Sequence, residues 1–220
     1  MIRVLELFSG TGSVGKCCDK LGWEVVSVDM IFEATHKCDI MDFDYKQYPK
    51  DHFDIIWASP PCCSFSILQG SWIGRNKRVN GELVLFTEEQ RKKDMLKGDL
   101  LVKKSLEIID YFDCEYWFME NPQSGNLKNR DYMKNIPFYD VDYCKYSDWG
   151  YRKRTRIWTN KKDFIPKKCQ CDCGYTIGRK HLNNLGNDYF KIDGKRVSKN
   201  YTQSMKYRIP EDLIFSLFLD

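Results

Sequence analysis

A cysteine stands directly after two prolines, at the end of a short apolar run. Residues 53–58 have the composition of a strand that is buried on both faces. Pro60 and Pro61 end that strand, because proline has no N–H for a sheet and fixes its own φ. Cys62 is therefore expected at the open edge of a sheet, where α/β proteins bind their ligands. It is either a nucleophile or a structural cysteine after a turn.

A carboxylate follows a second apolar run in the same manner. Residues 116–119 predict another buried strand, and Glu120, Asn121 and Pro122 come directly after it. The carboxyl ends of neighbouring parallel strands lie at one edge of a sheet. Cys62 and Glu120 are therefore expected to converge on one substrate.

The N-terminal residues predict a βαβ unit with a glycine-rich turn. Residues 2–8 form a predicted strand, residues 16–21 a helix that Gly22 ends, and residues 23–29 a second strand. Glycine suits the turn between the first strand and the helix, because a cofactor can press against backbone that has no Cβ.

This turn has the spacing of a nucleotide-binding site. Gly10, Gly12 and Gly15 satisfy the pattern G-x-G-x-x-G, and Asp29 ends the second strand, where a carboxylate can accept hydrogen bonds from ribose hydroxyls. The pattern predicts a nucleoside cofactor. Both a nicotinamide dinucleotide and S-adenosylmethionine fit it, so a dehydrogenase stays among the alternatives at this point.

The remaining segments continue the alternation of strands and helices. Residues 67–98 have no clean period and predict a mobile lid after the reactive cysteine. The apolar patterns predict strands at 38–44, 141–146 and 149–158, and helices at 99–112 and 211–219.

The length of the chain and its cysteines indicate how many domains it has and in which redox compartment it works. The 220 residues fit one domain, and without a leader or an apolar run of about 18 residues neither secretion nor a membrane span is expected. The ten cysteines then indicate free thiols in a reducing compartment. Cys169, Cys171 and Cys173 stand too close in sequence for a tetrahedral zinc site with His181, so no metal is expected there.

Charge is divided unevenly along the chain. Residues 1–150 contain 19 Lys and Arg and 24 Asp and Glu, whereas residues 151–220 contain 16 and 7. Arg152, Arg154 and Arg156 recur at the period of a strand, so their side chains should share one face. The basic part of the chain predicts contact with a polyanion, and a solvated basic face is the alternative.

The N-terminal features resemble those of the cytosine-5 methyltransferase family. Residues 7–12 are similar to its cofactor turn, and Asp29 and Asp39 are similar to the acids that bind ribose and adenine. The resemblance implies that S-adenosylmethionine is the cofactor. It also implies the residues that contact it: Phe8, Gly10, Thr11, Gly12, Asp29, Met30, Asp39, Ile40 and Pro60.

Three later segments resemble further motifs of that family, in the same order. Residues 61–66 are similar to its nucleophile motif Pro-Cys-Gln-x-Phe-Ser, with Cys63 where glutamine is usual. Residues 120–122 resemble its Glu-Asn-Val. Residues 152–156 resemble its Gln-x-Arg-x-Arg, with Arg152 in place of glutamine.

The resemblance implies a covalent mechanism on cytosine. The Cys62 thiolate would add to C6 of the base, which makes C5 nucleophilic toward the methyl donor. Glu120 would bond the base at N3 and N4, while Arg154 and Arg156 would hold O2 and the nearby backbone. The base would be flipped out, because C5 chemistry cannot be reached inside a duplex.

It also implies the architecture and partners of the protein. The expected fold is a Rossmann-like methyltransferase with a mostly parallel, doubly wound sheet. Residues 1–158 would form the catalytic domain, 159–207 a short basic target-recognition region, and 208–220 a helix that packs back on the catalytic domain. The expected substrate is double-stranded DNA, bound by a monomer. The protein would be a small, virus- or phage-encoded member that acts in the cytoplasm or in the host cell.

Two alternatives keep parts of this interpretation. One branch of the same family modifies tRNA with the same motifs, so RNA is a second substrate class. A protein that binds cofactor and DNA without turnover is a third possibility, and intact Cys62 and Glu120 argue against it. A dehydrogenase becomes remote, because hydride transfer requires neither Pro-Pro-Cys nor Glu-Asn-Pro.

Overall fold

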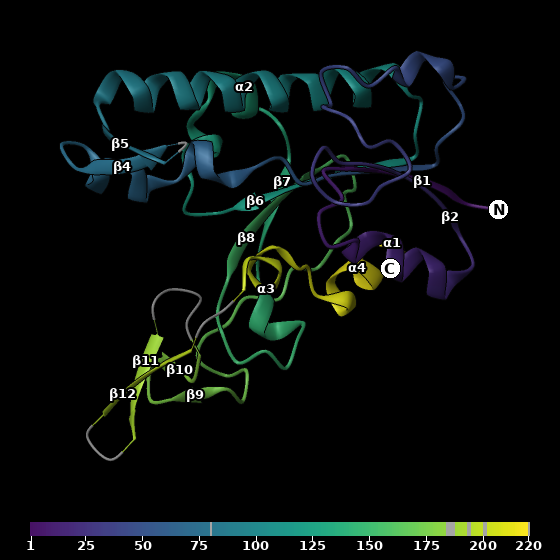
Figure 1. Cartoon of the computed structure of the whole chain (residues 1–220). Coiled ribbons are helices and arrows are strands. Elements are labelled where there is room, and N and C mark those ends of the chain that lie inside the picture. The colour runs from purple at the N-terminus through teal and green to yellow at the C-terminus, as the bar shows by residue number, and fades with distance from the viewer. Residues whose placement is uncertain (80, 184–187, 193–194, 200–201, 220) are drawn as a thin grey trace.

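Six strands form the central sheet, in the order β2-β1-β3-β6-β8-β7 (Figure 1). The computed structural model describes residues 1–79, 81–183, 188–192, 195–199 and 202–219. β1, β2, β3 and β6 run parallel, and β8 lies antiparallel between β6 and β7. The strands are β1 (Arg3–Leu7), β2 (Glu24–Val28), β3 (Ile55–Ala58), β6 (Tyr116–Pro122), β7 (Phe138–Asp142) and β8 (Arg154–Thr159). The prediction of a mainly parallel α/β sheet is confirmed.

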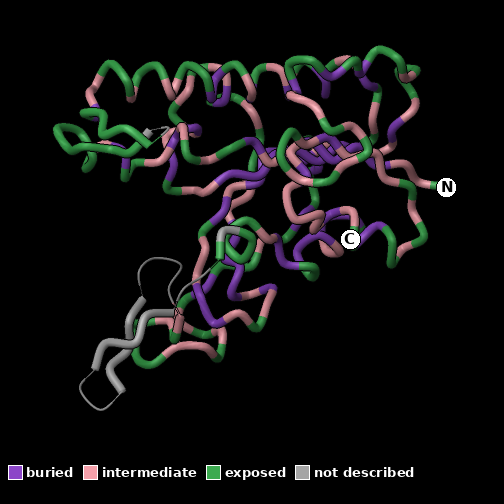
Figure 2. The backbone as a smooth tube through the Cα atoms, viewed as in Figure 1, coloured by how far each residue is buried: buried purple, intermediate pink, exposed green. Residues whose placement is uncertain are grey.

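Helices cover both faces of this sheet (Figure 1). α2 (Glu88–Tyr111) covers one face, and α1 (Ser13–Leu21) and α4 (Glu211–Leu219) cover the other. Alternate residues of β1 divide between the two cores: Leu5 packs on the α2 side and Val4 on the α1 and α4 side. Burial accordingly concentrates along the strands between the helices (Figure 2). Strands buried on both faces explain the continuous apolar runs of the sequence.

The sheet reverses its order at β1, and this places the site. From β1 the chain goes to β2 on one side and later to β3 on the other. Open α/β sheets bind ligands at the carboxyl ends of the strands that flank such a reversal. The glycine-rich turn follows β1 and Cys62 follows β3, so both occupy this edge.

Several predicted elements differ from the structure, among them the strand predicted at 149–158, which begins only at Arg154. Residues 38–44 form a turn instead of a strand, because Asp39 accepts hydrogen bonds from Met41 N through its side chain and from Asp42 N through its carbonyl oxygen, both at 2.9 Å. The strand predicted at 141–146 is wrong in its bounds. β7 ends at Asp142, and the next three residues form a 3-10 turn.

The segment predicted as an irregular lid is largely regular. It contains the 3-10 helix Ile67–Trp72, the hairpin of β4 (Asn76–Val79) and β5 (Glu82–Leu85), and the start of α2. α2 begins well before residue 99, because Thr87 Oγ1 accepts a hydrogen bond from Gln90 N at 3.2 Å and caps the helix. Its first turns are mostly exposed and polar, so they carry no apolar period.

The predicted recognition region, residues 159–207, contains short elements. They are β9 (Thr176–Ile177), β10 (Lys180–His181), β11 (Asp188–Ile192), β12 (Lys195–Lys199) and α3 (Gln203–Tyr207). Hairpins β9–β10 and β11–β12 pair only within themselves and lie away from the central sheet (Figure 1). Among the helices in the described part of the chain, none is long and apolar enough to span a bilayer.

α2 passes directly over the turn that carries the reactive cysteine. This 3-10 turn, Cys62–Phe65, packs against the middle of the helix at Gly98. A Cβ atom at position 98 would lie 2.6 Å from the Ser64 Cβ and 3.0 Å from the Phe65 ring. Only a glycine permits this approach, so α2 holds the turn in place from above.

We expect Gly98→Ala to lower the free energy of unfolding by about 1–3 kcal/mol, because the added methyl group overpacks the contact with Ser64. Elsewhere in a helix the same change would stabilise by about 1 kcal/mol. Urea unfolding followed by circular dichroism measures the difference. Lys97→Ala, one position away on the exposed face, is the control and should change stability little. A stabilised Gly98→Ala protein would contradict the close packing.

Candidate active site

The parallel pairing of β3 with β6 brings the predicted thiol and carboxylate to one edge. Ala58 pairs with Met119, so the next residues of both strands leave the sheet side by side. A buried hydrogen bond from Asn121 Nδ2 to the Pro60 carbonyl oxygen, 2.8 Å long, joins the two strand ends. Glu120 lies inside β6 instead of beyond its end and is 7% exposed.

Two side chains hold the Glu120 carboxylate. The Tyr143 hydroxyl donates a hydrogen bond to Oε1 at 3.0 Å, and Lys153 Nζ lies 3.4 Å from the same oxygen. Lys153 Nζ also lies 4.8 Å from the centre of the Tyr143 ring. A buried carboxylate needs such partners to remain charged, and Lys153 provides the compensating charge.

The Cys62 thiol is half-buried, and its ionisation depends on this ion pair. Burial raises the pKa of Cys62, and the negative charge of Glu120 raises it further. The positive charge of Lys153 lowers it. The neighbouring Cys63 is exposed. Burial and Glu120 therefore favour the neutral thiol of Cys62, whereas Lys153 favours its thiolate.

The three arginines of the basic motif share one face, as their spacing predicted. Arg152 forms a bidentate ion pair with Asp142, with distances of 3.0 and 2.9 Å. Arg156 forms a bidentate ion pair with Asp140, with distances of 2.7 and 2.9 Å. Arg154 lies 3.6 Å from Asp142, and its side chain is 57% exposed.

The strand register separates these arginines from the carboxylate. In β6 and β8, Glu120 pairs with Ile157 and Asn121 with Arg156, so Arg156 projects from the opposite face to Glu120. Arg156 also stacks on the Phe138 ring at 3.5 Å. Contact of Arg154 and Arg156 with a base stays a prediction, while Lys153 is the motif residue that lies against Glu120.

The glycine-rich turn has the conformation that a close ligand requires. Gly10 and Gly12 have φ values of 52° and 66°, and open space lies where a Cβ of Gly12 would be. Phe8 also has a positive φ, 59°, which is strained for a non-glycine residue. Ser9 Oγ is buried without a hydrogen-bond partner. An orphaned hydroxyl beside an open turn fits a polar ligand.

Asp29 supports this turn from the end of β2. Its Oδ2 accepts a hydrogen bond from Gly10 N at 2.9 Å, and its Oδ1 accepts from Ile31 N and Phe32 N at 2.8 Å. Oδ2, which accepts one hydrogen bond, keeps a lone pair that can face a ribose hydroxyl. These residues fit a nucleoside cofactor, with Asp29 shaping the turn as well.

The other predicted cofactor residues occupy different environments. Ile40 is buried in the α2-side core, and Pro60 is buried at the end of β3. Met30 is 62% exposed, and Asp39 is half-buried and forms its own turn. Thr11 is half-buried, and its carbonyl oxygen accepts a hydrogen bond from Lys16 at 2.8 Å. Their contact with S-adenosylmethionine stays a prediction.

The sequence interpretation missed three residues of this site. Glu6 is buried in β1 and accepts hydrogen bonds from Val14 N and Gly15 N at the start of α1, at 3.2 and 3.1 Å. Burial raises the pKa of its carboxyl to about 7 against the effect of these donors. Its charge within an apolar strand was a signal that could have found it. Lys153 lay inside the basic motif, whereas Tyr143 carried no signal.

Solved structures show which fold the chain has. The methyltransferase EhMeth of Entamoeba histolytica matches with a TM-score of 0.50 and 15% identity, over 76% of this chain and 55% of that one. A putative DNA modification methyltransferase encoded within an E. coli prophage matches with a TM-score of 0.49 and 14% identity, over 76% and 51%. The chain spans about half the length of these proteins. Its fold is the Rossmann-like fold of S-adenosylmethionine-dependent methyltransferases.

A viral relative identifies the family. No model of a protein family matches the chain. The chain is 39% identical over 222 residues to a probable DNA (cytosine-5)-methyltransferase of Frog virus 3 (isolate Goorha), and the match covers 98% of each protein. The chain therefore belongs to the DNA (cytosine-5)-methyltransferase family, and the predicted resemblance is confirmed.

Lys153 and Glu120 shift the pKa of the Cys62 thiol in opposite directions, so substitutions at the two positions form a matched test. Lys153→Met removes the cation that lowers the pKa of Cys62, so the thiolate fraction at pH 8 should fall. Glu120→Gln removes the anion that raises this pKa, so the thiolate fraction should rise. We expect changes of about threefold in opposite directions in the rate at which iodoacetamide alkylates Cys62, measured by peptide mass spectrometry.

Lys153→Arg keeps the charge and is the control, with a rate near that of the unmodified protein. The differences should shrink at higher pH, where the thiol is ionised in every variant. Rates that move in the same direction for Lys153→Met and Glu120→Gln would refute this electrostatic arrangement.

Proposed function

We propose that the protein methylates C5 of cytosine in double-stranded DNA, through a transient bond between Cys62 and the base. The observation that carries this proposal is the placement of Cys62, Glu120 and the Gly10–Gly12 turn at one edge of the sheet. A thiol, a buried carboxylate and a nucleoside-binding turn are the groups that this reaction requires. S-adenosylmethionine supplies the methyl group.

Cys62 provides the nucleophile. Its thiolate forms a bond to C6 of the cytosine, and the electron pair of the 5,6 double bond moves to C5, which takes the methyl group. Loss of the C5 proton then restores the double bond and expels the thiolate. Lys153 supports both ends of this cycle, because its charge favours the thiolate as attacking and as leaving group.

Glu120 orients the base. Its carboxyl group accepts a hydrogen bond from the N4 amino group and shares a proton with N3, which stabilises the negative charge that spreads to N3 when sulfur adds to C6. Tyr143, which donates a hydrogen bond to Oε1, fixes the carboxylate in this position. These polar groups cannot meet a base that is stacked in a duplex, so the cytosine must be flipped out.

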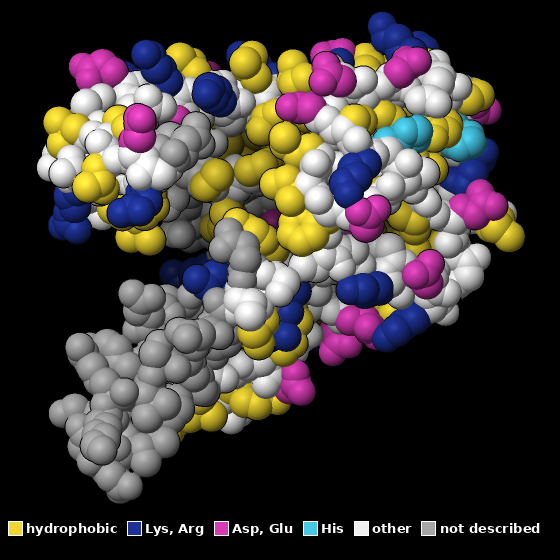
Figure 3. All heavy atoms as spheres, in the orientation of Figure 1, with side chains coloured by type: hydrophobic (Ala, Val, Ile, Leu, Met, Phe, Trp, Pro, Cys, Tyr) yellow, Lys and Arg dark blue, Asp and Glu magenta, His cyan; other side chains and the backbone are white. Residues whose placement is uncertain are grey.

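Basic side chains beside the site suit a nucleic acid. An open recess of about 570 Å³ borders Pro122, Ser124 and residues 152–154. Figure 3 shows basic side chains on the hollowed side of the molecule, below the β4–β5 hairpin. We infer that the flipped base enters from this recess and that a monomer binds the DNA. A free Cys62 thiol requires a reducing setting, such as the interior of a cell, and none of the ten cysteines, which all lie in the described part of the chain, forms a disulfide.

Cys62→Ala is expected to lower methyl transfer at least about a hundredfold, because no other group can form the bond to C6. The assay follows labelled methyl groups from S-adenosylmethionine into unmethylated DNA and identifies the modified base after digestion. Cys63→Ala is the matched control and should keep most of the activity. DNA that carries 5-fluorocytosine should form a denaturation-resistant complex with the unmodified protein and none with Cys62→Ala, since fluorine cannot leave as a proton does.

The same assay separates the alternatives. Label in tRNA instead of DNA would transfer the proposal to RNA. An active Cys62→Ala with an inactive Cys63→Ala would show that the wrong thiol is assigned. Binding of cofactor and DNA without any label transfer would indicate a protein that has lost turnover.

We expect DNA affinity to fall steeply with salt and to depend on the basic recognition region. Each phosphate contact lowers the slope of log affinity against log salt by about 0.9. Lys162, Lys168, Arg179 and Lys180 are exposed, and a Gln at two of these positions should flatten the slope measured by fluorescence anisotropy. Lys161 is excluded from this role, because it is buried and donates to the Leu217 carbonyl oxygen at 3.0 Å.

Lys92→Gln with Lys93→Gln, on the exposed side of α2, is the control and should leave the slope unchanged. A slope that responds to the α2 lysines and not to the recognition region would place the DNA on another face.

A further inference from the structure

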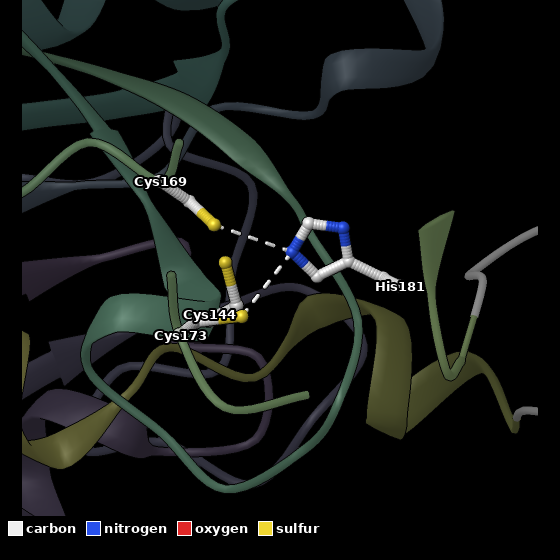
Figure 4. A group of neighbouring side chains, drawn as sticks. All are labelled: Cys144, Cys169, Cys173 and His181. Carbon is white, nitrogen blue, oxygen red and sulfur yellow. Dashed lines mark hydrogen bonds between the residues drawn. The ribbon is translucent and has the colours of Figure 1, made fainter. Parts of the chain in front are cut away.

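Three cysteines and a histidine from separate segments point toward one another (Figure 4). Cys144 lies in the 3-10 turn after β7, Cys169 and Cys173 in the loop that follows Phe164, and His181 on β10. Their sulfur and ring nitrogen atoms all lie within 4.8 Å of one another. His181 Nε2 is 3.4 Å from the sulfur atoms of both Cys169 and Cys173.

We propose that this cluster is a structural zinc site with four protein ligands: Cys144, Cys169, Cys173 and His181. Around one tetrahedral zinc ion, two thiolate sulfurs lie about 3.8 Å apart, and a sulfur and an imidazole nitrogen about 3.6 Å apart. The two sulfur-to-nitrogen distances of 3.4 Å are close to this value, and all the other ligand atoms lie within 4.8 Å of one another. Three thiolates and one imidazole are also a donor set typical of structural zinc, and four ligands leave no open position for catalysis.

The backbone resolves the crowding that the sequence suggested. Cys171 has a φ of 68°, and its carbonyl oxygen accepts a hydrogen bond from Thr176 Oγ1 at 3.0 Å. The left-handed residue turns the chain so that Cys171 stays outside the cluster while Cys169 and Cys173 enter it. The working spacing is therefore Cys-x3-Cys, which suits zinc. The fourth position is taken by Cys144, which is remote in sequence.

Groups next to the ligands hold them in place. Cys169 N donates a hydrogen bond at 2.8 Å to Asp142 Oδ2, and Asp142 is fixed by the ion pair with Arg152. Lys145, the residue after Cys144, pairs at 3.0 Å with Asp172, the residue before Cys173. Such supporting contacts orient zinc ligands before metal binds.

The segment that contains these ligands has little else to hold it. Among described side chains, neither hydrophobic core cluster includes one between residues 165 and 208. Ile177 is 76% exposed and Leu182 is 50% exposed. Small units without an apolar core commonly depend on a metal for folding. Zinc would thus fasten the β9–β10 hairpin to the turn that carries Tyr143, the residue that holds Glu120.

The test measures bound metal on the untagged full-length protein, purified with reductant and zinc and then passed through gel filtration. Elemental analysis should find about one zinc per chain. Cys173→Ser and His181→Ala should fall below about 0.1 zinc per chain, because a thiolate or the imidazole is lost. Cys171→Ser, the same substitution within the same loop, should keep the metal.

Cobalt gives a readout that does not depend on how the variants fold. Cobalt added to the metal-free wild-type protein should show thiolate-to-cobalt charge transfer and the intense visible bands of tetrahedral coordination. His181→Cys should keep the metal and strengthen the charge-transfer band, because a fourth thiolate replaces the imidazole. Wild-type protein with less than about 0.1 zinc, weak octahedral bands, or equal loss of metal in Cys171→Ser and Cys173→Ser would each overturn the proposal.

Discussion

The parallel pairing of β3 with β6 is the constraint on which the rest of the site depends. It sets Cys62 and Glu120 at the same edge, and the hydrogen bond from Asn121 to the Pro60 carbonyl locks the two strand ends together. A shift of one residue in this register would turn Glu120 to the opposite face. The packing of α2 through Gly98 serves the same end, since it presses the cysteine turn against the sheet.

The electrostatics of the site follow from burying a carboxylate beside a thiol. Burial and the charge of Glu120 both raise the pKa of Cys62, and the positive charge of Lys153 opposes this shift without reversing it. Tyr143 holds the carboxylate by a neutral hydrogen bond. The arginines of the same motif are paired with Asp140 and Asp142 on the other face of the strand. Alternation along residues 152–156 thus places Lys153 against Glu120 and the arginines on the opposite face.

A recognition region of this size has a stability problem that the proposed zinc site would solve. The catalytic part has two apolar cores, whereas the described side chains between residues 165 and 208 add to neither. Metal ligation replaces burial as the source of order in such segments. Because Cys144 adjoins Tyr143, the same site would couple the position of the region to the position of Glu120.

Local patterns in the sequence were enough to predict the sheet, the glycine turn and the thiol at a strand end, because apolar period, glycine and proline act on the backbone within a few residues. They also carried the resemblance to the cytosine-5 methyltransferase family, and the viral relative confirms that family. Contacts between distant segments lay outside such patterns. The start of α2 depends on the Thr87 cap and on exposed turns. The partners of Glu120 come from the turn after β7 and from residue 153. Cys144 meets Cys169, Cys173 and His181, which lie far from it in the sequence. These were decided by tertiary structure, since strand register and the left-handed Cys171 determine which side chains meet.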